Sequence, residues 1–192
     1  MTLGELKKKT LALIEEINTS ETSLTDDPDI AAKLPYVINQ ILHELARFKK
    51  IPAYEEREVE KGDILDLTTL GRDEDAEEPD TRNIFYQLKI IRNVDYETLD
   101  DTHVRFLEDG TALIKYYKYP VNIDTETADT TTLDLSEDAL EIAPYGIAAD
   151  VLKSDVSNQY GNIYANRYRE MIQTLDSRYA LGAIEIDGGI EV

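Results

Sequence analysis

Two histidines and many carboxylates are the residues of this chain whose chemistry could support catalysis or metal binding. The histidines are His43 and His103, and neither has a serine nucleophile or a second ligand near it in the sequence. The GxSxG, HExxH and GxxxxGK[ST] motifs of hydrolases, zinc proteases and nucleotide-binding loops do not occur. We therefore predict a protein without enzymatic activity, with no catalytic residues and no cofactor.

The carboxylates do not follow the spacing of a metal site. The best candidate for a calcium loop is DTETADTTTLD, residues 124–134, which lacks the central glycine and the closing glutamate. The chain has no cysteine, so thiolate metal sites, disulfides and cysteine nucleophiles are excluded. We predict no metal ligands, and we interpret residues 124–134 as a solvated loop.

The charge of the chain is strongly negative and unevenly distributed. It has 40 Asp and Glu against 20 Lys and Arg, a net charge of −20, and residues 51–141 hold 25 of the acidic and 9 of the basic residues. A field of this sign opposes nonspecific binding to nucleic acid. The acidic middle could be a solvated surface, or a face that a partner meets and DNA avoids. The amphipathic N-terminal segment is interrupted by Glu15 and Glu16, which is unlike a signal peptide or a membrane span.

Helical signals lie at the two ends of the chain. Thr2 and Glu5 form a capping-box pattern for a helix over 2–19, and Asp27 before Pro28 caps a helix that runs to about residue 50. We therefore predict an N-terminal helical pair over 1–52. Near the other end, Pro144 suits the first turn of a helix, and residues 136–179 form a helical hairpin with its corner at 154–157. The alternating tail of the C-terminal part, 136–192, could form a terminal strand.

Between the helices, residues 53–135 read as an acidic β-rich insertion. The predicted strands are 64–70, 84–91, 103–107, 112–121 and 130–135, with an exposed acidic loop over 71–81. Asp109-Gly110 is a hairpin turn signal, so we predict that 103–107 pairs with 112–119. The predicted fold is α+β: an antiparallel helical bundle built from both chain ends, with an antiparallel β insertion.

Tyrosine is the unusual aromatic residue of this chain, with twelve copies beside three phenylalanines and no tryptophan. Tyr160, Tyr164 and Tyr168 recur at helical spacing, and tyrosine can bury its ring while its hydroxyl stays in water. We predict an interface on this stripe and on the alternating tail residues Ile184 and Ile186. For Tyr164 and Tyr168, a place in the core is an equal alternative.

Three segments of the chain resemble head-tail connector (adaptor or neck) proteins of tailed bacteriophages. PYGIAADVLKSD (144–155) followed by YGNIYANRYREMIQTLD (160–176) is similar to their closing helices, and GELKKKTLALIEEIN through ELARFKK is similar to their opening helices. The resemblance implies a structural protein that forms a homo-oligomeric ring and joins the capsid portal to the tail or stopper proteins. The acidic β insertion departs from the smallest, all-helical connectors.

The resemblance also implies a location and a mode of assembly. The protein would be made in the host cytoplasm and end in the virion, with no membrane association. DNA would pass through the ring without specific binding, because an acidic channel repels phosphates. Strong self-repulsion would keep the isolated chain monomeric. A different class of function, an acidic inhibitor that mimics DNA, would use the same charge.

Overall fold

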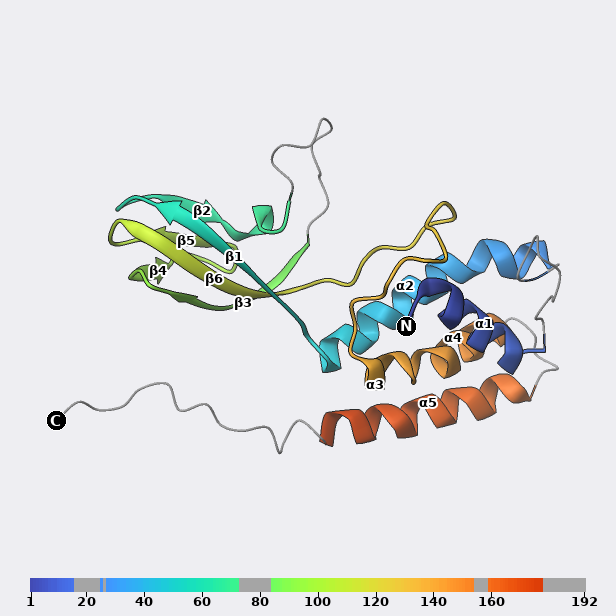
Figure 1. Ribbon diagram of the computed structural model, residues 1–192. Helices are drawn as coiled ribbons and strands as arrows, with labels where there is room; N and C mark the ends of the chain where they lie inside the picture. Colours follow the sequence, from blue (N-terminus) through green and yellow to red (C-terminus); the bar gives the residue numbers. More distant parts are fainter. Residues whose placement is uncertain (16–24, 26, 73–83, 154–158, 178–192) are drawn as a thin grey trace. The chain divides into compact units, whose positions relative to one another are not determined.

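The computed structural model describes residues 1–15, 25, 27–72, 84–153 and 159–177 (Figure 1), and it is α+β with two small antiparallel sheets. The chain divides into two compact units. The helical unit comprises residues 1–49 and 123–132 and the chain from Ser136 onward, and the β unit comprises 50–122 and 133–135. Residues 123–132, which were predicted to lie in the β insertion, thus belong to the helical unit.

The first two helices begin where their capping residues predict. Helix α1, Leu3–Leu13, starts with a full capping box: the Glu5 N–H donates to Thr2 Oγ1 (3.2 Å), and the Thr2 N–H donates to Glu5 Oε2 (2.8 Å). Helix α2, Pro28–Phe48, is capped by Asp27, which accepts from the next backbone N–H groups. Helix α1 was predicted to reach residue 19, but it ends at Leu13, and Glu15 has a left-handed backbone (φ 61°).

The C-terminal helical region consists of α3, Glu137–Leu140, α4, Ala143–Leu152, and α5, Tyr160–Ser177. Pro144 lies in the first turn of α4, as predicted. Helix α4 packs against α1, α2 and α5, and most of its residues are buried. Small residues allow this close packing: a Cβ added at Gly146 would lie 2.8 Å from the Tyr168 ring and 2.9 Å from Ile41 Cδ1. The predicted corner at 154–157 lies outside the described residues.

Residues 123–132 belong to the helical unit and form an irregular segment with bends at 125–127 and a turn at 129–130. Asn39 of α2 hydrogen-bonds the backbone of Ile123, and the N–H groups of Leu3 and Gly4 donate to the carbonyls of Thr131 (2.9 Å) and Asp129 (2.8 Å). The strand predicted over 130–135 was wrong, because only an isolated bridge between Thr2 and Thr132 forms there. The backbone partners of this segment lie at the first turn of α1, and a helix end does not offer the continuous row of N–H and C=O groups that pairs with a strand.

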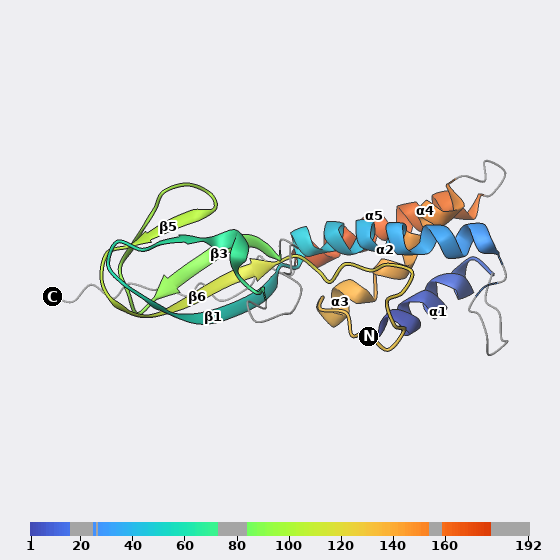
Figure 2. The same cartoon turned by 90° about the horizontal axis from the view of Figure 1, so that it is seen from above.

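The β unit consists of two three-stranded antiparallel sheets around a shared apolar core (Figures 1 and 2). One sheet has the order β1-β6-β3, with bounds Ile51–Val59, Gly110–Lys118 and Phe85–Arg92. The other has the order β2-β5-β4, with bounds Ile64–Asp66, His103–Phe106 and Tyr96–Thr98. The core draws on both sheets, with Ala112 and Ile114 of β6 and Val104 and Phe106 of β5 nearly inaccessible to solvent.

The predicted pairing of 103–107 with 112–119 was wrong. Strand β5 pairs with β2 and β4, and β6 pairs with β1 and β3, so the connection over residues 107–109 leads from one sheet to the other. Strand β1 pairs with β6 over nine residues, which is more than the four-residue β5 could offer. The end of β5 is held by other backbone groups, with the Gly62 N–H donating to Phe106 O and the Leu107 N–H to Asp95 O.

Other strand predictions were correct only in part. Strands β3, β5 and β6 lie close to their predicted positions, whereas β1 and β4 were missed. The charged run EEREV in β1 hides the usual alternation of polar and apolar residues, since both faces of this edge strand carry charges. The predicted strand 64–70 is the short β2 followed by a 3-10 turn, η1, over Leu67–Thr69, capped by Asp66.

Candidate docking surface on the last helix

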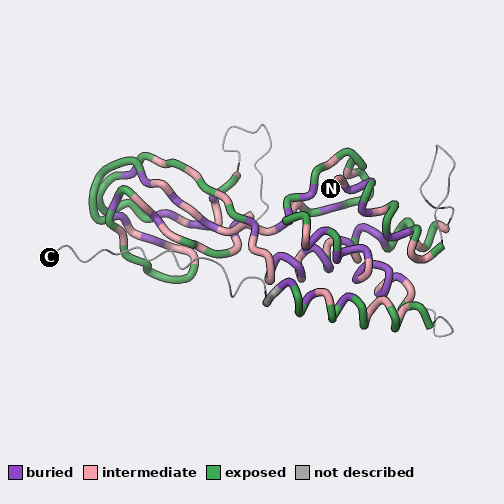
Figure 3. The backbone as a smooth tube through the Cα atoms, turned by 60° about the horizontal axis from the view of Figure 1, so that its bottom comes forward, coloured by how far each residue is buried: buried purple, intermediate pink, exposed green. Residues whose placement is uncertain are grey.

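The first turn of α5 exposes apolar and aromatic side chains. Tyr160 is 62% exposed and Ile163 is 56% exposed. The Tyr160 ring stacks on the Tyr164 ring, with centroids 6.5 Å apart and planes at 27°. The Tyr145 ring of α4 also contacts the Tyr164 ring, with centroids 6.3 Å apart. Figure 3 shows how buried and exposed residues alternate along α5. We name Tyr160, Ile163, Tyr164 and Tyr145 the α5 aromatic surface.

Tyr164 anchors this surface to the rest of the helical unit. Its hydroxyl donates to the carbonyl of Leu13, the last residue of α1, at 2.6 Å. Burial raises the pKa of the Tyr164 hydroxyl, and the Glu15 carboxylate and the two neighbouring tyrosines add to the shift. The neutral phenol is therefore favoured, which keeps its proton available for the bond to Leu13. Core and interface were the two predicted environments of Tyr164, and its half-buried side chain lies at the boundary between them.

Tyr168 lies in the core of the helical unit. It is 7% exposed, and its ring packs over Gly146 of α4. Its hydroxyl donates to Glu44 Oε2 of α2 at 3.1 Å, and burial together with the Glu44 carboxylate raises the pKa of this tyrosine far above its usual range. The predicted interface stripe therefore divides along the helix, with Tyr160 outside and Tyr168 inside. The predicted tail contacts Ile184 and Ile186 lie outside the described residues.

The two histidines occupy different environments. Burial, with a contribution from the Arg47 guanidinium, lowers the pKa of His43 on α2. His103 of β5 places Nδ1 3.0 and 3.1 Å from the two carboxylate oxygens of Asp100, a partner that was not predicted from the sequence. The Thr102 backbone N–H, followed by the His103 contact, lowers the pKa of Asp100 to about 2. This exposed pair orders the turn between β4 and β5.

Several carboxylates of the described region are engaged in local hydrogen bonds and ion pairs. In the predicted loop 124–134, Asp124 Oδ1 accepts from the Glu126 N–H (2.9 Å) and from Thr127 Oγ1 (2.7 Å), and Asp129 pairs with Lys7 Nζ at 2.8 Å. Within residues 1–15, 25, 27–72, 84–153 and 159–177, no group of three or more His, Asp or Glu side chains is arranged to hold a metal ion.

Comparison with known proteins gives no family. No protein-family model matches the chain, and no curated protein matches it significantly. In the part of the chain that the structure describes, none of the helices combines the length and the apolar character that crossing a membrane requires. Function must therefore be inferred from the described side chains. On the helical unit, their most distinctive feature is the α5 aromatic surface.

Proposed function

We propose that the protein is a non-enzymatic structural component of a tailed phage, a ring-forming neck protein that joins the capsid portal to the tail or stopper proteins. The observation that carries this proposal is the α5 aromatic surface. Tyr160 and Ile163 leave more than half of their surface in water, although the same helix buries Tyr168 and Leu175. Exposed rings of this kind gain free energy when a partner covers them.

The packing of helices from both ends of the chain supports the proposal. Helix α4 from the C-terminal part packs against α1 and α2 from the N-terminal part, and we interpret these helices as one antiparallel bundle built from both chain ends. The Tyr164 bond to Leu13 and the Tyr168 bond to Glu44 fasten α5 to both N-terminal helices. A surface that must fit a neighbouring subunit benefits from such a rigid support, because less side-chain freedom is lost on binding.

The charge of the chain suits a neck through which DNA passes. A net charge of −20 weakens every contact with phosphates, so the DNA would move without being held. The same charge would keep free copies apart in the host cytoplasm until a portal aligns them. The ring in the virion would then be stabilised by contacts to the portal as well as between copies.

The alternative function, inhibition by DNA mimicry, needs unpaired carboxylates along a rigid face. On the helical unit, several carboxylates are instead neutralised by lysines: Lys7 with Asp129, Lys9 with Glu141 and Lys49 with Asp138, each at 2.8 or 2.9 Å. Such ion pairs reduce the resemblance to a row of phosphates. The neck function is therefore the one that the geometry favours.

Co-expression with the portal protein encoded in the same genome tests the proposal. We expect the wild-type chain to co-purify with the portal and to form a ring on it that is visible by negative-stain electron microscopy. Replacing Tyr160 and Ile163 together by aspartate should abolish the ring, because the α5 aromatic surface then carries two charges that would have to be desolvated.

Tyr36→Asp is the matched control, because Tyr36 is a 77% exposed tyrosine on α2, outside the α5 aromatic surface. This variant should still form the ring. If the wild-type chain forms no complex with the portal, the neck function is wrong. If the double aspartate variant binds like the wild type, the neck function stands and the docking surface lies elsewhere.

A further inference from the structure

The outer face of the β1-β6-β3 sheet carries lysines and tyrosines, although the chain has a net charge of −20. Along β6, Ala112, Ile114 and Tyr116 point into the core, so Leu113, Lys115 and Tyr117 lie on the opposite face. Register places Tyr54 of β1, which is 75% exposed, opposite Lys115. This face belongs to the β unit, whereas the α5 aromatic surface belongs to the helical unit.

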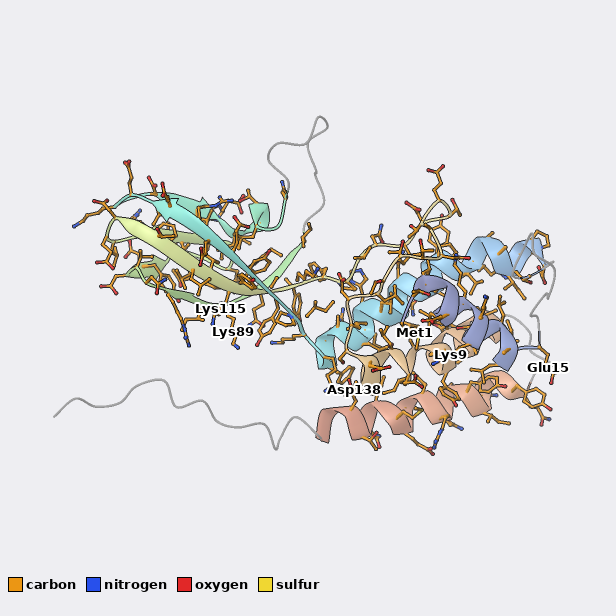
Figure 4. All side chains as sticks on the ribbon, in the orientation of Figure 1. Met1, Lys9, Glu15, Lys89, Lys115 and Asp138 are labelled. Atoms are coloured by element: carbon orange, nitrogen blue, oxygen red, sulfur yellow. The ribbon has the colours of Figure 1, made fainter. Side chains whose placement is uncertain are left out.

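Two irregularities in β3 bring further residues to this face. The pairing of β3 with β6 shifts between Phe85 and Gln87 and again between Leu88 and Ile90, so Tyr86 and Lys89 are the extra residues. Bulges of this kind redirect side chains and are frequent near functional sites. Tyr86 contacts the Tyr119 ring at 5.1 Å. Figure 4 shows Lys89 and Lys115 projecting from the same side of the sheet.

The lysines of this face are not paired with carboxylates of the described residues. Lys50 Nζ donates to Gln87 Oε1 at 2.6 Å and lies 5.0 Å from the centroid of the Tyr117 ring. None of Lys50, Lys89 and Lys115 forms an ion pair with a carboxylate among the residues that the structure describes. On the same unit, by contrast, Lys118 pairs with Asp134 at 2.9 Å. We define the lysine-tyrosine face by these residues: Lys50, Lys89, Lys115, Tyr54, Tyr86 and Tyr117.

We propose that the lysine-tyrosine face binds a carboxylate-rich segment of a partner protein. Three ammonium groups without carboxylates attract a negatively charged ligand, and this attraction is local because salt screens the more distant acidic residues. Tyrosine rings add apolar contact area, and their hydroxyls can donate hydrogen bonds to carboxylates. The proposal does not depend on the neck function.

A protein segment suits this face better than a nucleic acid. Glu56 and Glu58 of β1 continue the same face beyond Tyr54, opposite Leu113 and Thr111. A phosphate backbone running along the sheet would meet these carboxylates, whereas a short acidic segment can end before them. The net charge of −20 also penalises a ligand in proportion to its total charge, and nucleic acid carries a charge at every nucleotide.

Fluorescence anisotropy with labelled short probes tests the proposal on the full-length protein. The probes are a peptide that alternates glutamate with tyrosine, the same peptide with lysine in place of glutamate, and an oligothymidylate. We expect the wild type to bind the glutamate peptide and to bind the other two at least about tenfold more weakly. The variant carrying Lys89→Glu and Lys115→Glu should lose about tenfold in affinity for the glutamate peptide.

A variant carrying Lys8→Glu and Lys33→Glu is the control, because it changes the net charge equally at exposed positions of the helical unit. It should bind like the wild type, and circular dichroism checks that both variants are folded. The proposal is overturned if the wild type does not bind the glutamate peptide, if both variants lose affinity equally, or if oligothymidylate binds best. Self-association that only the Lys89 and Lys115 reversals abolish would assign the face to a second copy and would also overturn it.

Discussion

Asn39 binds the backbone of Ile123 with both ends of its side-chain amide. Its Nδ2 donates to the Ile123 carbonyl at 2.7 Å, and its Oδ1 accepts from the Ile123 N–H at 2.8 Å. One side chain of α2 thereby satisfies both polar groups of a residue whose apolar side chain is buried, with 2% of its surface exposed. This pair fixes the point at which the chain, after leaving the β unit, joins the helical unit.

Asn39→Ala should therefore lower the free energy of unfolding by about 1–3 kcal/mol, because the N–H and carbonyl of Ile123 lose their partners. Asn39→Asp keeps the acceptor but faces the Ile123 carbonyl with a charged oxygen, and we expect it to be no better than alanine. Urea denaturation of the three proteins measures this order. Equal stability of all three would show that water replaces the amide without loss.

Gly146→Ala should destabilise the helical unit. The added Cβ would come within 2.8–2.9 Å of the Tyr168 ring and Ile41, so the packing of α4 between α2 and α5 must expand. We expect a loss of about 1–3 kcal/mol. Gly161→Ala is the comparison, because its Cβ would come no closer than 3.3 Å, to Leu152, and alanine favours a helix. A melting temperature for Gly146→Ala at or above that of Gly161→Ala would contradict the packing argument.

Truncations of Tyr160 and Tyr168 should differ strongly in their effect on stability. Tyr168→Ala removes a buried ring and should cost about 3–5 kcal/mol of stability. Tyr160→Ala changes an exposed ring and should shift stability by no more than about 0.5 kcal/mol. Thermal melts of the two purified variants measure both effects. The division of α5 into a buried end and an exposed end fails if Tyr160→Ala is as destabilising as Tyr168→Ala.

The Asp100 turn should contribute stability that depends on pH. Its folded pKa of about 2 lies below the value of about 3.9 for an unfolded aspartate. Because the pKa of Asp100 is lower in the folded state, its contribution to stability is complete above the pKa of the unfolded state. This contribution disappears as the pH falls from about 4 towards 2. The difference in melting temperature between wild type and Asp100→Asn should therefore be larger at neutral pH than near pH 2. Asp101→Asn, which removes the adjacent exposed carboxylate and leaves the hydrogen bonds of Asp100 in place, is the control for the loss of one negative charge.

The isolated protein should be monomeric at low ionic strength. Each copy carries a net charge of −20, and repulsion between copies extends further when the Debye length exceeds its value of about 10 Å near 0.1 M salt. Light scattering over a salt series measures the molar mass. A stable ring formed at low salt without a portal would contradict assembly on a template.

The sequence alone determined the features that depend on neighbouring residues. The capping box of Thr2 with Glu5 and the cap of Asp27 with Pro28 involve atoms within one helical turn, so their spacing in the chain is sufficient. The β character of residues after 52 follows in the same way from local preferences. The aromatic stripe on α5 was also recognisable, because a helix repeats its faces every three to four residues.

Tertiary structure decided which of these elements meet. The chain bends at Leu107 and Glu108, just before the predicted turn at Asp109-Gly110, and Gly110 already begins β6, which pairs with β1, whose partner residues lie 51 to 67 positions away in the chain. Likewise, periodicity places Tyr160 and Tyr168 on one stripe, but only Glu44 and Gly146 from other helices bury the second of them. Strand pairing and side-chain burial depend on contacts between segments that are distant in the chain, and a local sequence pattern does not determine which segments come into contact.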